Sequence, residues 1–184
     1  MTTFHAFLGC SLDGYIAGPN GELHWLTVFD NTGYEGFFGS IDALAMGRRS
    51  YDVMRESAPD YYRGVPIHIL STTLPTGSHP DMGRSAVMVH SDIPSLQATL
   101  ADAGARRVYA DGGRTVQAFL AAGLLTDLTV TRVPVLLGAG IPLFGPLPDP
   151  VHAQLIESRS TNDGAVQSIY SFPTNARSAA PKST

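Results

Sequence analysis

A recurring order of short apolar run, turn and helical segment constrains this chain more than any other feature of its sequence. The runs at 86–90 (AVMVH) and 107–110 (RVYA) each fit a buried strand, and each leads through a turn into a segment of helical composition. Strands that alternate with helices of this length form βαβ units with parallel strands. Further strands are expected at 2–10, 42–46 and 66–70, and helices at 34–40, 48–56, 93–103 and 114–122. We therefore expect a three-layer α/β fold around a mostly parallel sheet.

The last third of the chain has a different pattern. The β-branched run at 128–137 is typical of a strand, and Pro134 within it predicts an edge position or a bulge. The segments 155–160 and 166–172 flank the tetrapeptide TNDG at 161–164, which is a strong signal for a hairpin. The sheet should therefore end in an antiparallel hairpin.

The length of 184 residues fits one domain. We expect this domain over residues 1–173, followed by a disordered tail at 174–184 that is small, polar and proline-containing. No apolar run approaches the ~20 residues that span a membrane. The N-terminus lacks the positive start and apolar stretch of a signal peptide. With one cysteine, Cys10, these features favour a cytoplasmic protein with a reduced thiol.

The charged residues argue against several classes of function. Eleven of the twelve cations are arginine, and the one lysine, Lys182, lies in the tail. A catalytic lysine and a Walker-type phosphate loop are therefore not expected. A net charge of −4 argues against nucleic-acid binding. One cysteine and six histidines without H-x-H or H-x-x-x-H spacing predict no metal site.

Three turns that follow expected strands carry residues suited to phosphate. In 111–115 (DGGRT) a strand enters two glycines and then a helix, so backbone N–H groups can approach an anion closely. The turn at 47–50 (GRRS) adds two guanidinium groups, and the turn at 71–73 (STT) adds hydroxyls. The carboxyl ends of parallel strands meet at one edge of a sheet, where α/β proteins usually bind ligands. Each turn alone also fits a plain connection, but together they predict a small-molecule site with a phosphate-rich cofactor.

Two other motifs are weaker. The Gly-x-Gly at 138–140 follows a strand, but Leu143 stands at the third glycine of a dinucleotide fingerprint and Pro142 would break the helix. The run at 9–13 (GCSLD) matches a nucleophile elbow at two positions only. A serine hydrolase that uses Ser11 is therefore a minor alternative.

Six motifs occur along the chain in a specific order. They are SLDGYIA at 11–17, WLT at 25–27, MGRRSY at 46–51, LST at 70–72, DGGR at 111–114 and PVLLGAGIPLF at 134–144. This series, over residues 4–172, resembles the dihydrofolate reductase-like superfamily. Within it the chain looks most like stand-alone members of the group built on the C-terminal reductase domain of the riboflavin-biosynthesis deaminase-reductase. The resemblance implies a mixed sheet and NADPH as the cofactor.

The resemblance also implies roles for individual residues. Those that would hold cofactor phosphates are Gly47, Arg48, Arg49, Ser50, Ser71 and Thr72, the last two at the adenosine 2′-phosphate. Those that would cover the pyrophosphate are Gly112, Gly113, Arg114 and Thr115. Those that would lie beside the nicotinamide are Gly9, Ile16 and Ala17. On the substrate side, Trp25 would lie on a loop over the ring and Thr131 would line the pocket.

Catalysis by such a protein needs a proton as well as a hydride. Asp30 lies five residues after Trp25, a spacing suited to the carboxylate that supports pterin protonation in dihydrofolate reductases. Asp30, Asp13 or a water would deliver the proton, although Asp13 also fits an Asp-Gly turn. Phe7 and Tyr15 replace basic residues typical of the riboflavin-type reductases, which argues against a ribose-phosphate substrate.

The sequence thus predicts an NADPH-dependent reductase of this group. It would transfer a hydride to a pyrimidine- or pterin-like substrate, as a 5-amino-6-(5-phosphoribosylamino)uracil reductase does. The alternative is a catalytically silent module that binds a nucleotide or pterin. Monomer and homodimer both stay open, because the riboflavin-type relatives are dimers and dihydrofolate reductases are commonly monomers.

Overall fold

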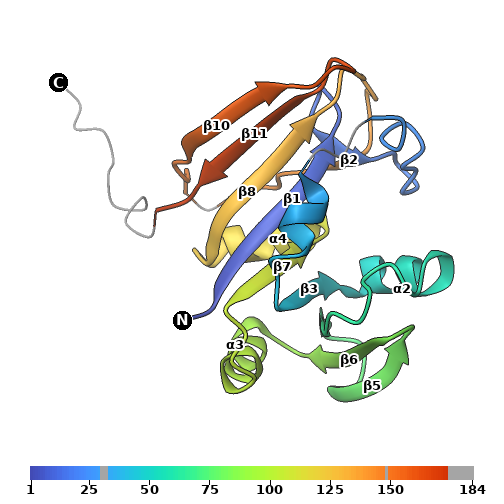
Figure 1. Cartoon of the computed structure of the whole chain (residues 1–184), viewed down its shortest axis with the longest axis vertical. Helices are drawn as coiled ribbons and strands as arrows, with labels where there is room; N and C mark the ends of the chain where they lie inside the picture. The colour runs from blue at the N-terminus through green and yellow to red at the C-terminus, as the bar shows by residue number, and fades with distance from the viewer. Residues whose placement is uncertain (30–32, 148, 174–184) are drawn as a thin grey trace.

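The fold is built on one nine-stranded sheet, in a computed structural model that describes residues 1–29, 33–147 and 149–173. The strand order is β10-β11-β8-β1-β7-β3-β4-β6-β5 (Figure 1). The strands are β1 (Thr3–Cys10), β3 (Ala43–Gly47), β4 (Ile67–Leu70), β5 (Gly77–Met82), β6 (Ser85–His90), β7 (Arg107–Asp111), β8 (Leu125–Arg132), β10 (Gln154–Ser160) and β11 (Val166–Ser171). Neighbours from β8 to β6 pair in parallel, whereas β10, β11 and β5 run antiparallel. The mostly parallel sheet and its C-terminal hairpin are therefore confirmed.

Helices cover both faces of the sheet. On one face lie α1 (Tyr34–Phe38) and α2 (Arg48–Ser57), whose buried aromatic residues join one hydrophobic cluster. On the other face lie α3 (Ile93–Asp102) and α4 (Gly113–Ala121), whose apolar residues join a second cluster. A small second sheet pairs β2 (Tyr15–Ala17) with β9 (Ile141–Pro142). The three-layer α/β prediction is confirmed.

The central strand β1 is buried on both faces because its side chains are apolar on both faces. Phe4 points to the α3–α4 side, where its ring stacks on Phe119 with centroids 4.4 Å apart. Phe7 points to the opposite side and packs against Tyr34 of α1. Burying an aromatic side chain of this size contributes about 2–3 kcal/mol. This central position brings the carboxyl end of β1 beside those of β7 and β8.

Two details differ from the sequence-based expectation. Strand β8 covers Leu125–Arg132 and lies between β1 and β11, so the edge position predicted from Pro134 is wrong. The chain leaves the sheet before that proline, and no ladder hydrogen bond is required of it. Strands β2, β5 and β9 were not expected. The sequence of β5, GSHPDM, has no apolar alternation, and it forms a strand only because it pairs along β6 at the edge of the sheet.

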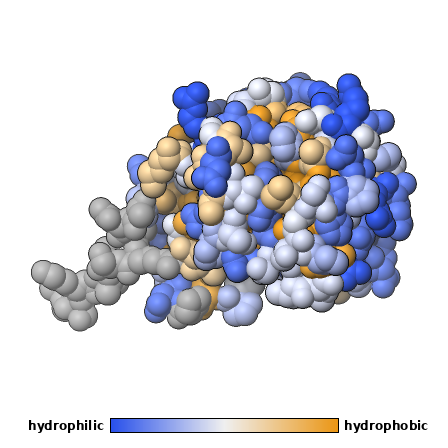
Figure 2. Space-filling model, turned by 90° about the horizontal axis from the view of Figure 1, so that it is seen from below, coloured by the Kyte–Doolittle hydropathy of each residue, from blue (hydrophilic) through white to orange (hydrophobic). Residues whose placement is uncertain are grey.

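One face of the molecule carries apolar areas within polar surroundings. The face in Figure 2 is mainly hydrophilic, with apolar side chains in separate patches. No helix among the described residues is long and apolar enough to cross a membrane.

Candidate active site

The three turns predicted to bind phosphate meet at the carboxyl edge of the sheet. Strand β3 pairs with both β7 and β4, which places Met46 beside Asp111 and Gly47 beside Leu70. The turns after these strands are therefore neighbours. They are also tightly packed, because a Cβ atom on Gly112 would lie 2.5 Å from Ser50 Oγ. A side chain at position 112 would displace the Ser50 hydroxyl, and the φ of +85° is one that favours glycine.

The two helices that begin at this edge have open N-termini. In the described residues, α2 after Gly47 and α4 after Gly112 have no side-chain cap on their first N–H groups. Helix α3 is different, since Asp92 Oδ1 accepts a hydrogen bond from Ser95 N at 2.8 Å. Uncapped first-turn N–H groups carry a positive partial charge that favours a phosphate group. The glycine cradle and the two helix starts therefore fit the phosphates of a dinucleotide.

The side chains expected at the 2′-phosphate also come together. Arg48 Nη1 donates to Thr73 Oγ1 at 2.9 Å, and Thr73 Oγ1 lies 3.2 Å from Ser71 Oγ. Ser71 is buried and its hydroxyl accepts the backbone N–H groups of Thr73 and Leu74, which shapes the loop. Thr72 is exposed beside it. A guanidinium and several hydroxyls thus surround one point at the end of β4.

The residues expected beside the nicotinamide lie next to the glycine turn. Ile16 Cδ1 would lie 2.5 Å from a Cβ on Gly113, so β2 packs directly on the start of α4. At the end of β1, the side chain of Leu26 covers Gly9, with Cδ1 2.6 Å from where a Cβ would lie. Trp25 is buried against Val133 and Ala165, and its Nε1 donates to Glu22 O. Leu26 rather than Trp25 is thus the side chain over Gly9.

Of the other predicted cofactor residues, two can be placed by their contacts. Thr115 is buried in the first turn of α4, and its Oγ1 would lie 3.6 Å from a Cβ on Gly47. Arg49 Nη2 would lie 3.3 Å from a Cβ on Gly21, so this guanidinium points toward the loop before Trp25. Ala17 is buried in β2, and Arg114 is exposed in α4.

The predicted proton donors have different surroundings. The carboxylate of Asp13 accepts hydrogen bonds from Ser11 Oγ at 2.6 Å and from Gly138 N at 2.8 Å. These hydrogen bonds lower the pKa of Asp13, and the bond from Ser11 has the largest effect. Asp13 therefore ties the β1–β2 turn to the loop before β9, and the hydroxyl proposed as a nucleophile is already engaged. Asp30 lies outside the described residues.

A third carboxyl group, not singled out by the sequence, lies at the centre of this edge. Asp111 Oδ2 accepts from Tyr62 Oη at 2.8 Å, and Oδ1 accepts from Tyr109 Oη at 3.1 Å. Asp111 as a residue is half-buried, but desolvation raises the pKa of its carboxyl, while the tyrosine hydrogen bonds oppose that rise. Only its place beside the double glycine could have marked it in the sequence, because Tyr62 is 49 positions away.

Asp111 also shares a face of the sheet with Gly9, which was predicted to lie beside the nicotinamide. His5 pairs with Tyr109, so the alternate positions Phe7, Gly9 and Asp111 point to the same side. Tyr109 Oη also lies 3.0 Å from Phe7 O, so its single hydrogen is shared between that carbonyl and Asp111 Oδ1, and the contact holds β7 against β1. A protonatable carboxyl, the glycine turn and the end of β1 therefore surround one region.

The match to known families agrees with this geometry. A model of the RibD C-terminal domain matches residues 3–167. The chain belongs to that family.

Relatives of this RibD C-terminal domain have known structures. A Shewanella sp. PV-4 protein, described as a candidate riboflavin biosynthesis protein, is 31% identical. Its TM-score is 0.82 over 93% of this chain and 99% of that one. The Thermotoga maritima diaminohydroxyphosphoribosylaminopyrimidine deaminase/5-amino-6-(5-phosphoribosylamino)uracil reductase is 13% identical, with a TM-score of 0.67 over 93% of this chain and 56% of that one. These matches confirm the dihydrofolate reductase-like fold. The uncharacterized Bacillus subtilis protein YyaP is 25% identical over 171 residues, which are 89% of this chain and 91% of YyaP.

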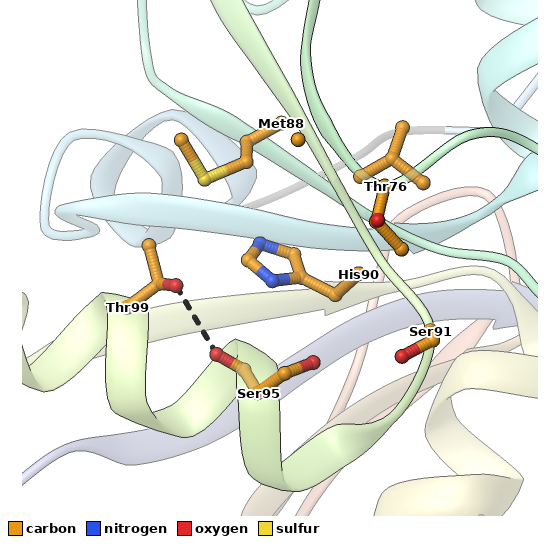
Figure 3. A pocket seen from close by; sticks show the side chains of 8 residues that line it. Thr76, Met88, His90, Ser91, Ser95 and Thr99 are labelled. Atoms are coloured by element: carbon orange, nitrogen blue, oxygen red, sulfur yellow. Dashed lines mark hydrogen bonds between the residues drawn. The ribbon is translucent and has the colours of Figure 1, made fainter.

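This RibD-type domain also has a pocket of about 310 Å³ between β6 and α3. Figure 3 shows Met88 and His90 of β6 opposite Ser95 and Thr99 of α3. His90 adjoins the loop at 71–73 that was predicted to bind the cofactor, since its carbonyl accepts a hydrogen bond from Ser71 N at 2.9 Å. Behind it, His90 Nε2 lies 2.9 Å from His68 Nδ1, and both rings are buried. Strand register places Met46, Ile69 and Val89 on the face of Asp111, so Met88 and His90 point to the opposite face, which α3 covers.

Proposed function

We propose that the protein is an NADPH-dependent reductase that transfers a hydride to a pyrimidine- or pterin-like heterocycle. The observation that carries this proposal is the meeting of two uncapped helix starts, the Gly112 turn and Arg48 with Ser71, next to the half-buried carboxyl of Asp111. Membership of the RibD C-terminal domain family, a reductase family, supports the same activity.

The chain's own residues divide the work between phosphate binding and substrate orientation. The first-turn N–H groups of α2 and α4 and the Arg48, Ser71 and Thr73 cluster would hold the phosphates. When bound, NADPH supplies the hydride. Leu26 and Phe7 would exclude water and present an apolar wall to a planar ring.

The proton would come from Asp111. Because desolvation raises its pKa, its neutral, proton-bearing form persists to higher pH than for an ordinary aspartate. The two tyrosines hold the carboxyl in one orientation. The hydride would add to the carbon of a C=N or C=O group and the carboxyl proton to its nitrogen or oxygen.

Titration of the purified protein with NADPH tests the first half of the proposal. Saturable binding below millimolar concentration is expected, followed by NADPH oxidation with a panel of dihydrofolate and aminouracil ribosyl compounds. Binding without any oxidation would favour the catalytically silent module. Absence of binding at millimolar cofactor would refute the reductase.

The variant Asp111→Asn tests the second half. It keeps the size of the side chain and removes the acid, so kcat should fall by about 10²–10⁴-fold while the Kd for NADPH stays the same. The control is Asp102→Asn, which changes an exposed aspartate at the end of α3. An unchanged kcat in Asp111→Asn would mean that Asp13, Asp30 or water delivers the proton instead.

We also propose that two copies associate through the edge strand β10. All seven of its residues are exposed, including Leu155 at 53% and Ile156 at 59%. An exposed apolar edge strand is a template for pairing with another chain. Sedimentation equilibrium should give twice the monomer mass, and replacing Ile156 by lysine should restore the monomer. A monomer at all concentrations would contradict the association.

A further inference from the structure

The two tyrosine hydroxyls that contact Asp111 differ in the acceptors available to them. Tyr62 Oη lies 2.8 Å from Asp111 Oδ2, and within the described ranges it makes no other hydrogen bond. Tyr109 Oη lies 3.1 Å from Asp111 Oδ1 and 3.0 Å from the carbonyl oxygen of Phe7. A hydroxyl group has one hydrogen to donate and can also accept. Tyr109 can therefore direct its hydrogen to either of two oxygen atoms, whereas Tyr62 has a single acceptor.

Packing fixes both rings, so that only the hydroxyl hydrogens are free to turn. Tyr109 is 4% exposed and meets the ring of Phe37 edge-on, with centroids 5.0 Å apart. Tyr62 is 2% exposed and meets the ring of Tyr61 edge-on, with centroids 5.1 Å apart. Burial raises the pKa values of Tyr62, Tyr109 and the neighbouring Tyr34, so all three hydroxyls keep their hydrogens at neutral pH. The carboxyl of Asp111 is thus the group in this cluster that changes its protonation state.

The neutral form of this carboxyl requires an acceptor for its own hydrogen. The ionised form only accepts, and both tyrosines then donate to it. A hydrogen on Oδ2 would face the hydrogen of Tyr62, which has no second acceptor in the part of the chain that the structure describes. A hydrogen on Oδ1 faces Tyr109 Oη, which accepts it and turns its own hydrogen to Phe7 O. Because a buried donor without a partner is costly, the neutral form carries its hydrogen on Oδ1.

We propose that Tyr109 is a positioning residue that reverses its hydrogen bond with Asp111 when the carboxyl loses its proton. This inference rests on the proposed function, in which Asp111 supplies the proton for the reduction. During the reaction the Oδ1–H bond breaks and the proton bonds to the nitrogen or oxygen of the substrate. The hydrogen of Tyr109 stays on its own oxygen and turns from Phe7 O to Oδ1, where negative charge has developed. A hydroxyl already held beside Oδ1 stabilises that charge without movement of a ring.

Carbon-13 NMR reads the reversal without substrate or turnover. A carbonyl carbon changes its chemical shift when its oxygen gains or loses a hydrogen bond. The shift of the Phe7 carbonyl should therefore titrate with the pKa of the Asp111 carboxyl. In Tyr109→Phe and in Asp111→Asn, the Phe7 shift should stay constant over the same pH range. A Phe7 shift that stays constant in the wild type while Asp111 titrates would overturn the proposal.

The variant Tyr62→Phe is the comparison for a hydroxyl with one acceptor. It removes a donor that favours the carboxylate, since hydrogen bonds to a charged group are roughly twice as strong as neutral ones. The pKa of Asp111 should therefore rise by about one unit, which is tenfold in acidity, and the Phe7 carbonyl should still titrate. In Tyr109→Phe the pKa should move by less than about half a unit, because that hydroxyl bonds to both forms of the carboxyl. Equal shifts in the two variants would make Tyr109 a simple donor and would contradict the reversal.

Turnover tests the positioning role. Tyr109→Phe should lower kcat about tenfold with little change in KM, because the charge on Oδ1 then forms without its donor. In the Asp111→Asn background the same substitution should have no further effect, whereas a loss of packing would lower kcat in both backgrounds. The matched control Tyr170→Phe changes a half-buried tyrosine of β11 that pairs with Leu128 and so points to the other face of the sheet. It should leave kcat and the pKa of Asp111 unchanged.

The two proposals fail in different ways. If the wild type oxidises NADPH and Tyr109→Phe keeps the wild-type kcat, the role of Tyr109 is refuted and the reductase proposal stands. If the wild type oxidises no NADPH, the proposed function has failed, and the NMR titration of Phe7 alone decides whether Tyr109 reverses its hydrogen bond.

Discussion

Acid should weaken this fold through the buried histidine pair, His68 and His90. Their ring nitrogens lie 2.9 Å apart, with stacked rings on the neighbouring strands β4 and β6. One nitrogen of the pair must accept the shared hydrogen bond, so at least one ring must be neutral. Burial, and then the neighbouring His90, lower the pKa of His68 from its ordinary value of 6.5 to about 4. Burial also lowers the pKa of His90.

The direction and size of the effect follow from linkage. The unfolded chain takes up a proton on His68 near pH 6.5, whereas the folded chain resists it until about pH 4. The unfolded state therefore binds more protons between these values, and stability falls as the pH is lowered through that window. For these two pKa values the loss between pH 7.5 and pH 4.5 is about 2.5 kcal/mol from His68 alone.

Urea unfolding at pH 7.5 and pH 4.5 measures this loss. Carboxylates such as Asp13 and Asp42, whose pKa values are lowered, also lose stability in acid, so the informative quantity is a difference between variants. His68→Leu removes the titrating ring and should reduce the pH-dependent loss by about 2.5 kcal/mol, even if it is less stable at pH 7.5. The control His152→Gln changes an exposed histidine and should follow the wild type.

One result would refute the reasoning. If His68→Leu and the wild type lose the same free energy of unfolding between the two pH values, the buried pair does not resist protonation. The 2.9 Å contact would then not require a neutral ring.

Two further substitutions test the edge of the sheet. Gly112→Ala should reduce NADPH affinity by tenfold or more and lower the free energy of unfolding by about 1–2 kcal/mol, since φ at this position is +85° and the new Cβ would lie 2.5 Å from Ser50 Oγ. A Kd equal to that of the wild type in a fluorescence titration would contradict the close packing of the two turns. Asp92→Ala should cost about 1 kcal/mol in urea unfolding, because it removes the cap on Ser95 N, and an unchanged midpoint would mean that water caps α3 equally well.

Local sequence could predict the strand–turn–helix units that carry the proposed cofactor site. The strand, the glycine turn and the helix of 107–121 are adjacent in sequence. The pattern of apolar residues, the turn residues and the helix start therefore all predict one βα unit. The same holds for Gly47 and Arg48. Bringing these turns together requires the ends of β3, β4 and β7 to be neighbours, and the parallel pairing of the three strands places them so.

The substrate side could not be predicted in the same way. Asp111 looked like a turn residue, because the tyrosines that enclose it come from β7 and from the segment before β4. Thr131, which was expected to line the substrate pocket, accepts a hydrogen bond from Gln167, whose amide oxygen accepts one from Arg159. These contacts depend on the registers of β10, β11 and β8, which a one-residue slip would reverse.

The sequence by itself therefore determined the layered α/β class and the strand–turn–helix units at which we propose phosphate binding, because those depend on contacts between near neighbours along the chain. Only the tertiary structure decided which tyrosines enclose Asp111 and which side chains contact the buried amide of Gln167. Those choices depend on strand order and register, which join residues more than 100 positions apart, as in the hydrogen bond from Tyr109 to Phe7.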